Sequence, residues 1–72
     1  MSERVRKIVA DVLRIPEDRL PEEATRESVP EWTSLEHLRI IDELERACGS
    51  SVTMDEALAL TSLAKLAERF GD

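Results

Sequence analysis

The sequence predicts an all-α fold, a small four-helix bundle with three longer helices and one short helix. Apolar side chains recur three and four residues apart in several separate stretches, as they do on one face of a helix. Only two of the 72 residues are glycines and only 3% are aromatic. There is thus little turn material for a multi-stranded sheet, and the core must be mainly aliphatic. We expect one domain over residues 1–72, near the lower size at which a chain folds without disulfides or metals.

The first predicted helix begins after Ser2, which can act as its N-cap, and ends before Pro16. Pro16 has no N–H to donate and pushes the preceding residue out of the helical region, so the helix must stop there. The residues of its apolar stripe are Val5, Ile8, Val9, Val12 and Leu13.

A long loop is predicted between the first and second helices, over residues 16–32. A loop of this length in so small a domain is either functional or disordered. Three spaced apolar residues, Leu20, Val29 and Trp32, favour an ordered loop because each could reach the core. We expect Trp32, the largest of them, to anchor the loop at the edge of the core.

The second predicted helix begins with a capping box and runs from Ser34 to Cys48. The Thr33 hydroxyl would accept the N–H of Glu36, and the Glu36 carboxylate would reach back to the N–H of Thr33. Ser34 then takes the first helical position, beside N–H groups without intrahelical partners and at the positive end of the helix dipole. A phosphate esterified to this serine would be favourably placed. Gly49 is a suitable residue to end the helix.

At 100° per residue, the second helix has an apolar side and a polar side. Leu35 falls in the middle of the polar side, next to Ser34, where it could serve as a small anchor for a partner. We expect Arg39 to pair with Glu36 or Glu43, and Asp42 with Arg46. The apolar side, which should face the core, holds His37, Leu38, Ile40, Ile41, Leu44 and Cys48.

Two further helices are predicted in the last third of the chain. A second capping box, Thr53 with Glu56, opens a short helix over residues 54–60, in which Ala57, Leu58 and Leu60 are apolar. Thr61 would then cap a fourth helix that ends at Gly71. Its apolar stripe is Leu63, Leu66, Ala67 and Phe70. The tripeptide Thr-Ser-Leu of residues 33–35 recurs at residues 61–63, so three residues alone specify little.

The motifs in this order resemble the acyl carrier protein family over nearly the whole chain. They are a first helix closed by Ile15-Pro16-Glu17-Asp18, a long loop, the segment Trp32-Thr33-Ser34-Leu35-Glu36-His37-Leu38, and a short third and a fourth helix. In that family the serine of an Asp-Ser-Leu motif bears 4'-phosphopantetheine, whose thiol holds acyl or aminoacyl groups. By position that serine is Ser34, and Thr33 stands where the family most often has Asp.

The resemblance implies a carrier that catalyses nothing itself. A phosphopantetheinyl transferase would modify Ser34 from coenzyme A, with Mg²⁺ on the enzyme, and a ligase or acyltransferase would load the thiol. Downstream biosynthetic enzymes would then dock. The expected docking face is Leu35, Glu36, Arg39, Asp42 and Glu43. The Trp-x-Ser-Leu-x-His-Leu form looks most like discrete carriers of specialised pathways, such as secondary metabolite, modified sugar or aminoacyl transfer, rather than of primary fatty-acid synthesis, and we expect a monomer. Thr33 keeps open an alternative, a carrier-like interaction module that is never modified.

Other function classes are disfavoured by composition. The net charge of −6 argues against nucleic-acid binding. Ser34 and His37 could meet on the helix as a nucleophile and a base, but an orienting carboxylate and an oxyanion loop are lacking, and His37 suits a buried supporting role better. One cysteine and one histidine do not make a metal site. The lone Cys48 and the short apolar runs indicate a cytoplasmic protein without a signal peptide or membrane span.

Overall fold

The computed structural model of the protein describes residues 3–71, so the predicted cap Ser2 lies outside the described residues. It contains four α-helices, α1 (Glu3–Leu13), α2 (Ser34–Cys48), α3 (Met54–Ala59) and α4 (Leu63–Phe70), and one 3-10 turn, η1 (Glu17–Arg19). No strand forms among residues 3–71. The predicted all-α bundle, with three longer helices and one short one, is therefore confirmed, and α2 has the predicted bounds.

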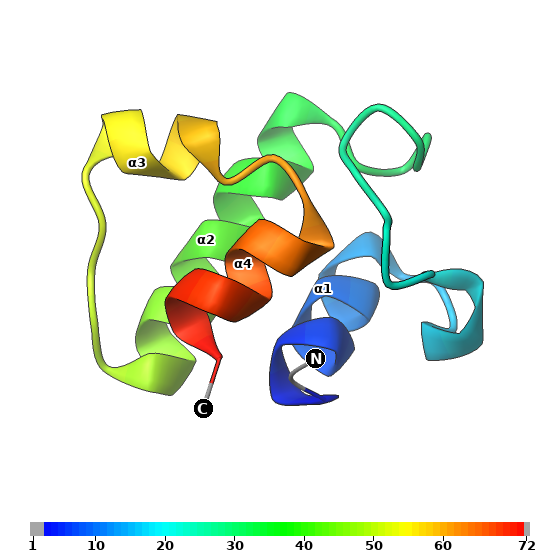
Figure 1. Cartoon of the computed structure of the whole chain (residues 1–72), viewed down its shortest axis with the longest axis horizontal. Helices are drawn as coiled ribbons and strands as arrows, with labels where there is room; N and C mark the ends of the chain where they lie inside the picture. The colour runs from blue at the N-terminus through cyan, green and yellow to red at the C-terminus, as the bar shows by residue number, and fades with distance from the viewer. Residues whose placement is uncertain (1–2, 72) are drawn as a thin grey trace.

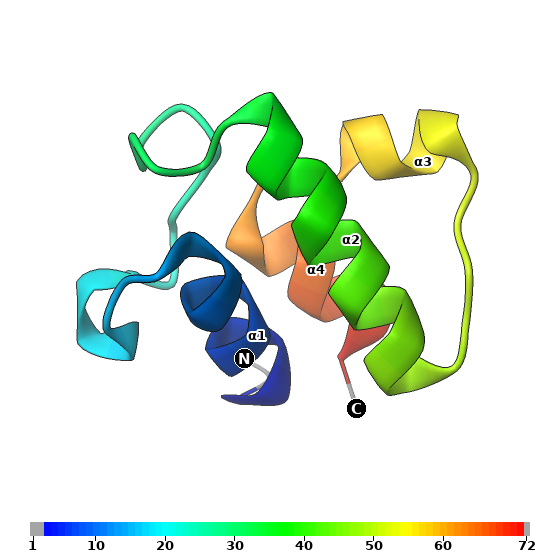
Figure 2. The same cartoon turned by 180° about the vertical axis from the view of Figure 1, so that it is seen from behind.

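The helices α1, α2 and α4 pack against one another, while α3 lies at one edge of the bundle, beside the first half of α2 (Figure 1). Seen from behind, α2 runs in front along the whole molecule, and the loop that joins α1 to α2 lies on the side opposite α3 (Figure 2). The core between the three longer helices is almost entirely aliphatic. Its most deeply buried apolar residues are Val5, Val9, Leu20, Ile40, Leu44, Leu63 and Leu66.

The loop between α1 and α2 is ordered, because its apolar residues reach the core as predicted. Leu20, Val29 and Trp32 are all buried, with only 3% of Trp32 exposed. Ala24 is also buried, which the sequence pattern did not indicate. The 3-10 turn η1 was not predicted either. The guanidinium of Arg6 in α1 donates to the carbonyl of Glu17, 2.8 Å away, and so holds this turn against the bundle.

The start of α4 is joined to this loop by backbone hydrogen bonds. The N–H of Arg26 donates to the carbonyl of Thr61 at 3.0 Å, and the N–H of Leu63 donates to the carbonyl of Ala24 at 2.9 Å. Between these bonds, Thr25 and Ser62 form an isolated antiparallel bridge. Two segments far apart in the sequence are thus fixed side by side just before α2 begins.

The end of α1 differs in mechanism from the prediction. The helix ends at Leu13, before Pro16 can act, because Arg14 adopts a left-handed conformation with φ 60°. The N–H of Arg14 then donates to the carbonyl of Asp11, and the N–H of Ile15 donates to the carbonyl of Ala10. This pair of bonds is a Schellman motif, which satisfies carbonyls at the end of the helix.

Three further expectations about the helices are corrected. Leu38, placed on the core side of α2, is 45% exposed, because it lies at the border of the apolar stripe. The short helix α3 ends at Ala59 rather than Leu60. The cap of α4 is Ser62 rather than Thr61, since it is the Ser62 hydroxyl that accepts the N–H of Lys65, at 3.1 Å.

Candidate functional site

Ser34 is the first residue of α2, and its side chain is exposed. The preceding residue, Thr33, has extended backbone angles, and its hydroxyl accepts the N–H of Glu36 at 3.3 Å. The cap therefore uses the threonine hydroxyl and leaves the serine hydroxyl outside the helix. By helix geometry the N–H groups of Ser34 and Leu35 have no intrahelical partner. The Ser34 hydroxyl consequently lies at the positive end of the helix dipole.

Only one half of the predicted capping box forms at this end. The N–H of Thr33 donates to the carbonyl of Glu31 at 3.0 Å, so it is not available to the carboxylate of Glu36. That carboxylate instead lies 3.5 Å from the guanidinium of Arg39, one turn further along α2. The tight turn before the helix and the ion pair on its surface together replace the reciprocal bond.

The second Thr-Ser-Leu tripeptide, at residues 61–63, has a different register relative to its helix. Ser62 is the N-cap of α4, so its hydroxyl accepts a backbone N–H and its backbone is bridged to Thr25. Leu63 takes the first helical position there. The serine hydroxyl of the first tripeptide is thus not used to cap α2, whereas that of the second caps α4.

The guanidinium of Arg26 donates a hydrogen bond to the Ser34 hydroxyl oxygen over 2.9 Å. Arg26 comes from the ordered loop, where its own N–H is bonded to Thr61. The sequence pattern did not single out this residue. A signal was present, however, because Arg26 is one of only two basic residues among seven acids over residues 17–36.

His37 is 1% exposed and has a partner on each ring nitrogen. The indole N–H of Trp32 donates to Nδ1 over 3.0 Å, and Nε2 lies 2.8 Å from the carbonyl of Ala57. Because the indole can only donate and the carbonyl can only accept, the ring is neutral with its proton on Nε2. Burial lowers the pKa of His37 below its usual value, outweighing the bond to Ala57, which raises it; the positive charge of Arg26 lowers it further.

These contacts give His37 a structural role and not that of a base for Ser34. One nitrogen ties the helix to the loop through Trp32, and the other ties it to α3 through Ala57. Neither nitrogen is left for the hydroxyl of Ser34. The buried, supporting histidine that the sequence favoured is what the structure contains.

The expected docking residues all lie on α2, on the side away from the core. Leu35 is 61% exposed. Of the two partners predicted for Arg39, it is Glu36 that pairs with it, and Asp42 pairs with Arg46 at 3.2 Å. Among residues 3–71, the exposed large apolar side chains are Leu35 and Leu38 on α2 and Met54 and Leu58 on α3.

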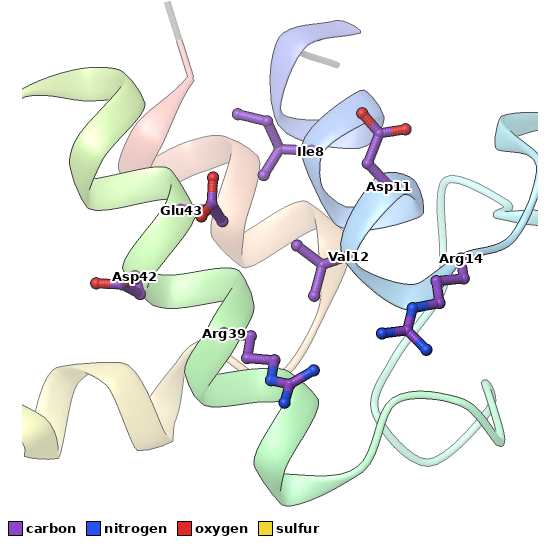
Figure 3. A pocket seen from close by; sticks show the side chains of 7 residues that line it. All are labelled: Ile8, Asp11, Val12, Arg14, Arg39, Asp42 and Glu43. Atoms are coloured by element: carbon purple, nitrogen blue, oxygen red, sulfur yellow. The ribbon is translucent and has the colours of Figure 1, made fainter.

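A groove of about 400 Å³ separates the polar side of α2 from α1. Ile8 and Val12 of α1 form its apolar wall, and the guanidinium groups of Arg14 and Arg39 point towards each other across one end (Figure 3). Asp42 and Glu43 lie along the α2 side of the same groove. Three of the five expected docking residues, Arg39, Asp42 and Glu43, therefore line a groove rather than a flat surface.

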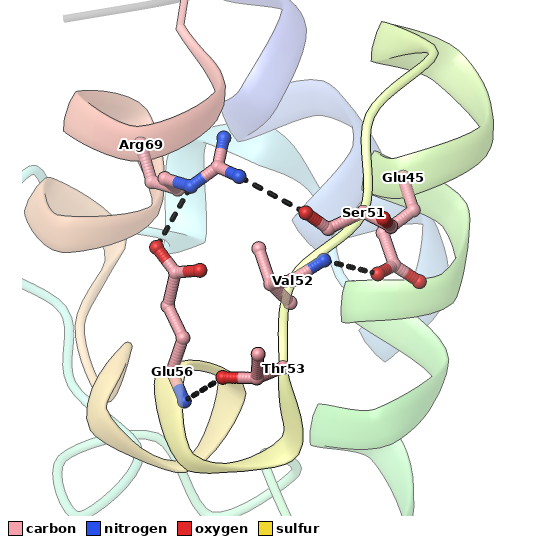
Figure 4. A network of polar contacts seen from close by, with 6 residues as sticks. All are labelled: Glu45, Ser51, Val52, Thr53, Glu56 and Arg69. Atoms are coloured by element: carbon pink, nitrogen blue, oxygen red, sulfur yellow. Dashed lines mark hydrogen bonds and ion pairs between the residues drawn. The ribbon is translucent and has the colours of Figure 1, made fainter.

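The position of α3 depends on polar contacts as well as on burial (Figure 4). Arg69 of α4 donates to the carboxylate of Glu56 at 2.8 Å and to the carbonyl of Ser51 at 3.1 Å. The N–H of Val52 donates to the carboxylate of Glu45 in α2, also at 2.8 Å. The Thr53 hydroxyl caps α3 as predicted, but Glu56 is bound to Arg69 and does not return to Thr53.

Two other features are absent from residues 3–71. No group of three or more His, Cys, Asp or Glu side chains in this range could hold a metal ion. None of the helices described is long and apolar enough to cross a membrane.

A family model for the phosphopantetheine attachment site matches residues 3–70. The chain belongs to this family. Phosphopantetheine attachment domains bear 4'-phosphopantetheine as their prosthetic group, so the resemblance to acyl carrier proteins is confirmed. A search of curated proteins finds no match.

The residues at the start of α2 fit such a prosthetic group. Its root is a phosphodiester with one negative charge, which favours N–H donors and a nearby cation. The N–H groups of the first turn that lack intrahelical partners would supply the donors, and the guanidinium of Arg26, 2.9 Å from the Ser34 oxygen, would supply the cation. No other serine with a described environment combines an exposed hydroxyl with the first position of a helix.

Proposed function

We propose that the protein is a carrier whose 4'-phosphopantetheine is attached to the hydroxyl of Ser34. The observation that supports this most directly is the register of α2, which makes Thr33 the cap and leaves Ser34 exposed in the first turn. Within a family defined by phosphopantetheine attachment, an exposed hydroxyl at this position supports Ser34 as the residue that a modifying enzyme would reach. When bound, the group supplies a thiol that holds an acyl or aminoacyl cargo as a thioester.

The protein's own residues would supply position and recognition, not catalysis. A phosphopantetheinyl transferase would bring coenzyme A and Mg²⁺ to Ser34, and a ligase or acyltransferase would load the cargo. These enzymes, and the downstream biosynthetic enzymes, would dock on Leu35, Glu36, Arg39, Asp42 and Glu43. Such contacts are mainly polar, and they suit a monomer in the cytoplasm that must exchange partners quickly.

The partners that we propose belong to a specialised pathway rather than to primary fatty-acid synthesis. Arg39 and Arg46 interrupt the acidic surface of α2, and both are ion-paired within the helix. An enzyme whose basic face complements a uniformly acidic helix would have fewer unpaired carboxylates to bind on α2. Such an enzyme would therefore bind this carrier more weakly than a uniformly acidic one.

The test is the intact mass of the protein after incubation with coenzyme A, Mg²⁺ and a broad-specificity phosphopantetheinyl transferase. We expect the wild type to gain the mass of one phosphopantetheine and Ser34→Ala to gain none, because the alanine has no oxygen to form the phosphodiester. Ser62→Ala is the matched control, since it removes the serine of the other Thr-Ser-Leu tripeptide, and it should be modified like the wild type.

Two outcomes would contradict the proposal. Modification of Ser34→Ala would place the group on another residue. No modification of the wild type, even by transferases of the source organism, would favour the interaction module that is never modified. Thr33→Asp would then remain unmodified as well, whereas in a carrier an acidic neighbour of the serine should speed the reaction.

A further inference from the structure

The bond between Arg26 and Ser34 is unusual because nothing in the local fold requires it. The cap of α2 is complete without it, since Thr33 supplies the acceptor. The guanidinium donates to a neutral hydroxyl, which is a weaker partner than a carboxylate or a phosphate. Arg26 therefore has capacity left for a stronger acceptor at the same place.

The surroundings of Arg26 are acidic, and within residues 3–71 its guanidinium is not used in an ion pair. Residues 17–36 hold seven acids and two arginines. Arg19, the other arginine, lies 3.6 Å from the carboxylate of Glu31. Among the described residues, none of the ion pairs involves Arg26, and the cap beside Ser34 is an uncharged threonine. A phosphodiester on Ser34 would meet a surface of like charge, in which Arg26 is the cation already in place.

Arg26 is also held in position by its backbone. Its N–H is bonded to the carbonyl of Thr61. The residue before it, Thr25, is bridged to Ser62, and the N–H of Leu63 is bonded to Ala24. A side chain anchored in this way loses less conformational entropy when it binds than one on a free loop.

We propose that Arg26 is a positioning residue for the prosthetic group. Once Ser34 is modified, the guanidinium of Arg26 donates to the phosphodiester oxygens. This contact fixes the start of the arm against the loop of residues 24–33. No bond is made or broken in this step. The inference rests on the proposed attachment at Ser34, and it adds the residue that sets the direction in which the arm leaves the helix.

The test compares unmodified and modified protein for the wild type, Arg26→Gln, Arg26→Lys and the matched control Arg19→Gln. The first readout is the thermal unfolding midpoint at low salt. We expect modification to raise the midpoint of the wild type and of Arg19→Gln by a few degrees, because a charge-assisted pair is gained. The rise should be absent in Arg26→Gln, partly retained in Arg26→Lys, and weakened by about 1 M salt.

The second readout is the NMR signal of the Arg26 side-chain Nε–H group. In the wild type it should shift on modification and exchange more slowly with water, while the Arg19 signal stays in place. If Arg26 had a purely structural role, modification would change neither the position of its Nε–H signal nor the exchange of that group with water. The midpoints of unmodified and modified Arg26→Gln would then fall equally.

The possible outcomes separate the two proposals. If the wild type gains no phosphopantetheine, both proposals fail. If it gains the group but the Arg26 signal does not change, or if Arg26→Gln keeps the full rise in midpoint, only the role of Arg26 is overturned. Loss of the rise in Arg26→Gln alone, together with the shift of the Arg26 signal, supports it.

Discussion

His37 shows how one buried polar residue can join three parts of the molecule. Its ring accepts from Trp32 in the loop and donates to Ala57 in α3, while its backbone belongs to α2. The bond from Trp32 requires an unprotonated Nδ1, whereas the bond to Ala57 requires only the proton on Nε2. A second proton at Nδ1 would oppose the indole N–H of Trp32, so protonation competes with the Trp32 contact.

The stability of the protein should therefore fall in mildly acidic solution. The pKa of His37 is lowered in the folded state, so below its unfolded value of about 6.5 the unfolded chain binds the proton more readily. The contribution of His37 is complete above pH 6.5 and is lost as the pH falls from there towards the lowered pKa. Urea unfolding followed by far-ultraviolet circular dichroism at several pH values would measure this slope.

The control for this prediction is Trp32→Phe, which removes the indole N–H. Nδ1 can then accept a proton without opposing a donor, so the fall between neutral pH and pH 5 should become shallower. At neutral pH this variant should lose about 1–3 kcal/mol, because a buried ring nitrogen is left without its donor. An equally steep slope in the variant would mean that the bond from Trp32 does not contribute to the pH dependence.

For single residues, the sequence indicates which side chains have a structural role, but it is less informative about the partners that they bind. The hydroxyl caps at Thr33 and Thr53 follow from local spacing, and both form. The carboxylate halves of these capping boxes do not form, because Arg39 and Arg69 bind Glu36 and Glu56 instead. The bond from Arg26 to Ser34 depends on a pairing with residues 61–63, which no local pattern reveals.

The chain turns away from α1 and from α2 through the same left-handed conformation, but with different residue types. Both helices end in a residue with a left-handed backbone, Arg14 with φ 60° and Gly49 with φ 66°. Glycine adopts this conformation without strain, whereas a side chain brings its Cβ close to the backbone. Nothing lies within 4 Å of a Cβ placed at Gly49, so backbone strain alone would determine the effect of a side chain there.

Exchanging these residue types should shift stability in opposite directions. Arg14→Gly should raise the free energy of unfolding by about 0.5–1 kcal/mol, because the strain at the end of α1 is relieved. Gly49→Ala should lower it by about 1 kcal/mol for the converse reason. Urea denaturation of both variants would check this. A stabilising Gly49→Ala, or a destabilising Arg14→Gly, would contradict the strain argument.

The short helix α3 should open more readily than the rest of the bundle. It has only six residues, and it is held largely through Ala57, Leu60 and the bond from Arg69 to Glu56. Arg69→Met removes that bond while keeping the length of the side chain. We expect hydrogen exchange at the amides of Ala57 and Leu60 to become roughly two- to five-fold faster, with little change in the middle of α2.

The matched control for α3 is Arg46→Met, which removes an exposed pair with Asp42 inside α2. This variant should leave exchange in α3 unchanged. If both variants accelerate exchange at Ala57 equally, the effect comes from global stability and not from the contact between α4 and α3.

The order and type of the helices could be predicted because each begins and ends with local signals. The spacing of apolar residues gave α2 its bounds, with Thr33 before it and Gly49 after it. Two errors arose where local signals are ambiguous. Thr61 and Ser62 are both able to cap, and pairing with Thr25 decides between them. Leu38 lies at the edge of the stripe, where the angle alone does not decide exposure.

The whole molecule has an uneven charge that should govern how partners approach. Its net charge is −6, yet residues 2–14 hold four basic and two acidic side chains. The face proposed for docking therefore belongs to the acidic part. For a transferase with a basic face, raising the salt from about 50 to 500 mM should lower kcat/KM for modification roughly tenfold, because the attraction is screened.

The apolar part of the same face should act differently from the charges. Leu35→Ala should raise KM several-fold while leaving the salt dependence unchanged, since it removes a contact and not a charge. It should also leave stability within about 0.5 kcal/mol, because the side chain is exposed. Leu58→Ala on α3, similarly exposed but outside the proposed face, serves as the control. An equal rise in KM in both variants would mean that the docking surface includes α3.

The setting of Cys48 has a practical consequence for chemical labelling. The thiol is half-buried and donates to the carbonyl of Phe70 at the end of α4, 3.3 Å away. A maleimide or disulfide reagent must disturb that contact to reach it, whereas a phosphopantetheine arm attached to Ser34 would begin at an exposed residue. In the native protein such a reagent would mark the arm first, and so a fluorophore or affinity tag could be attached to the cargo position without altering any residue of the chain.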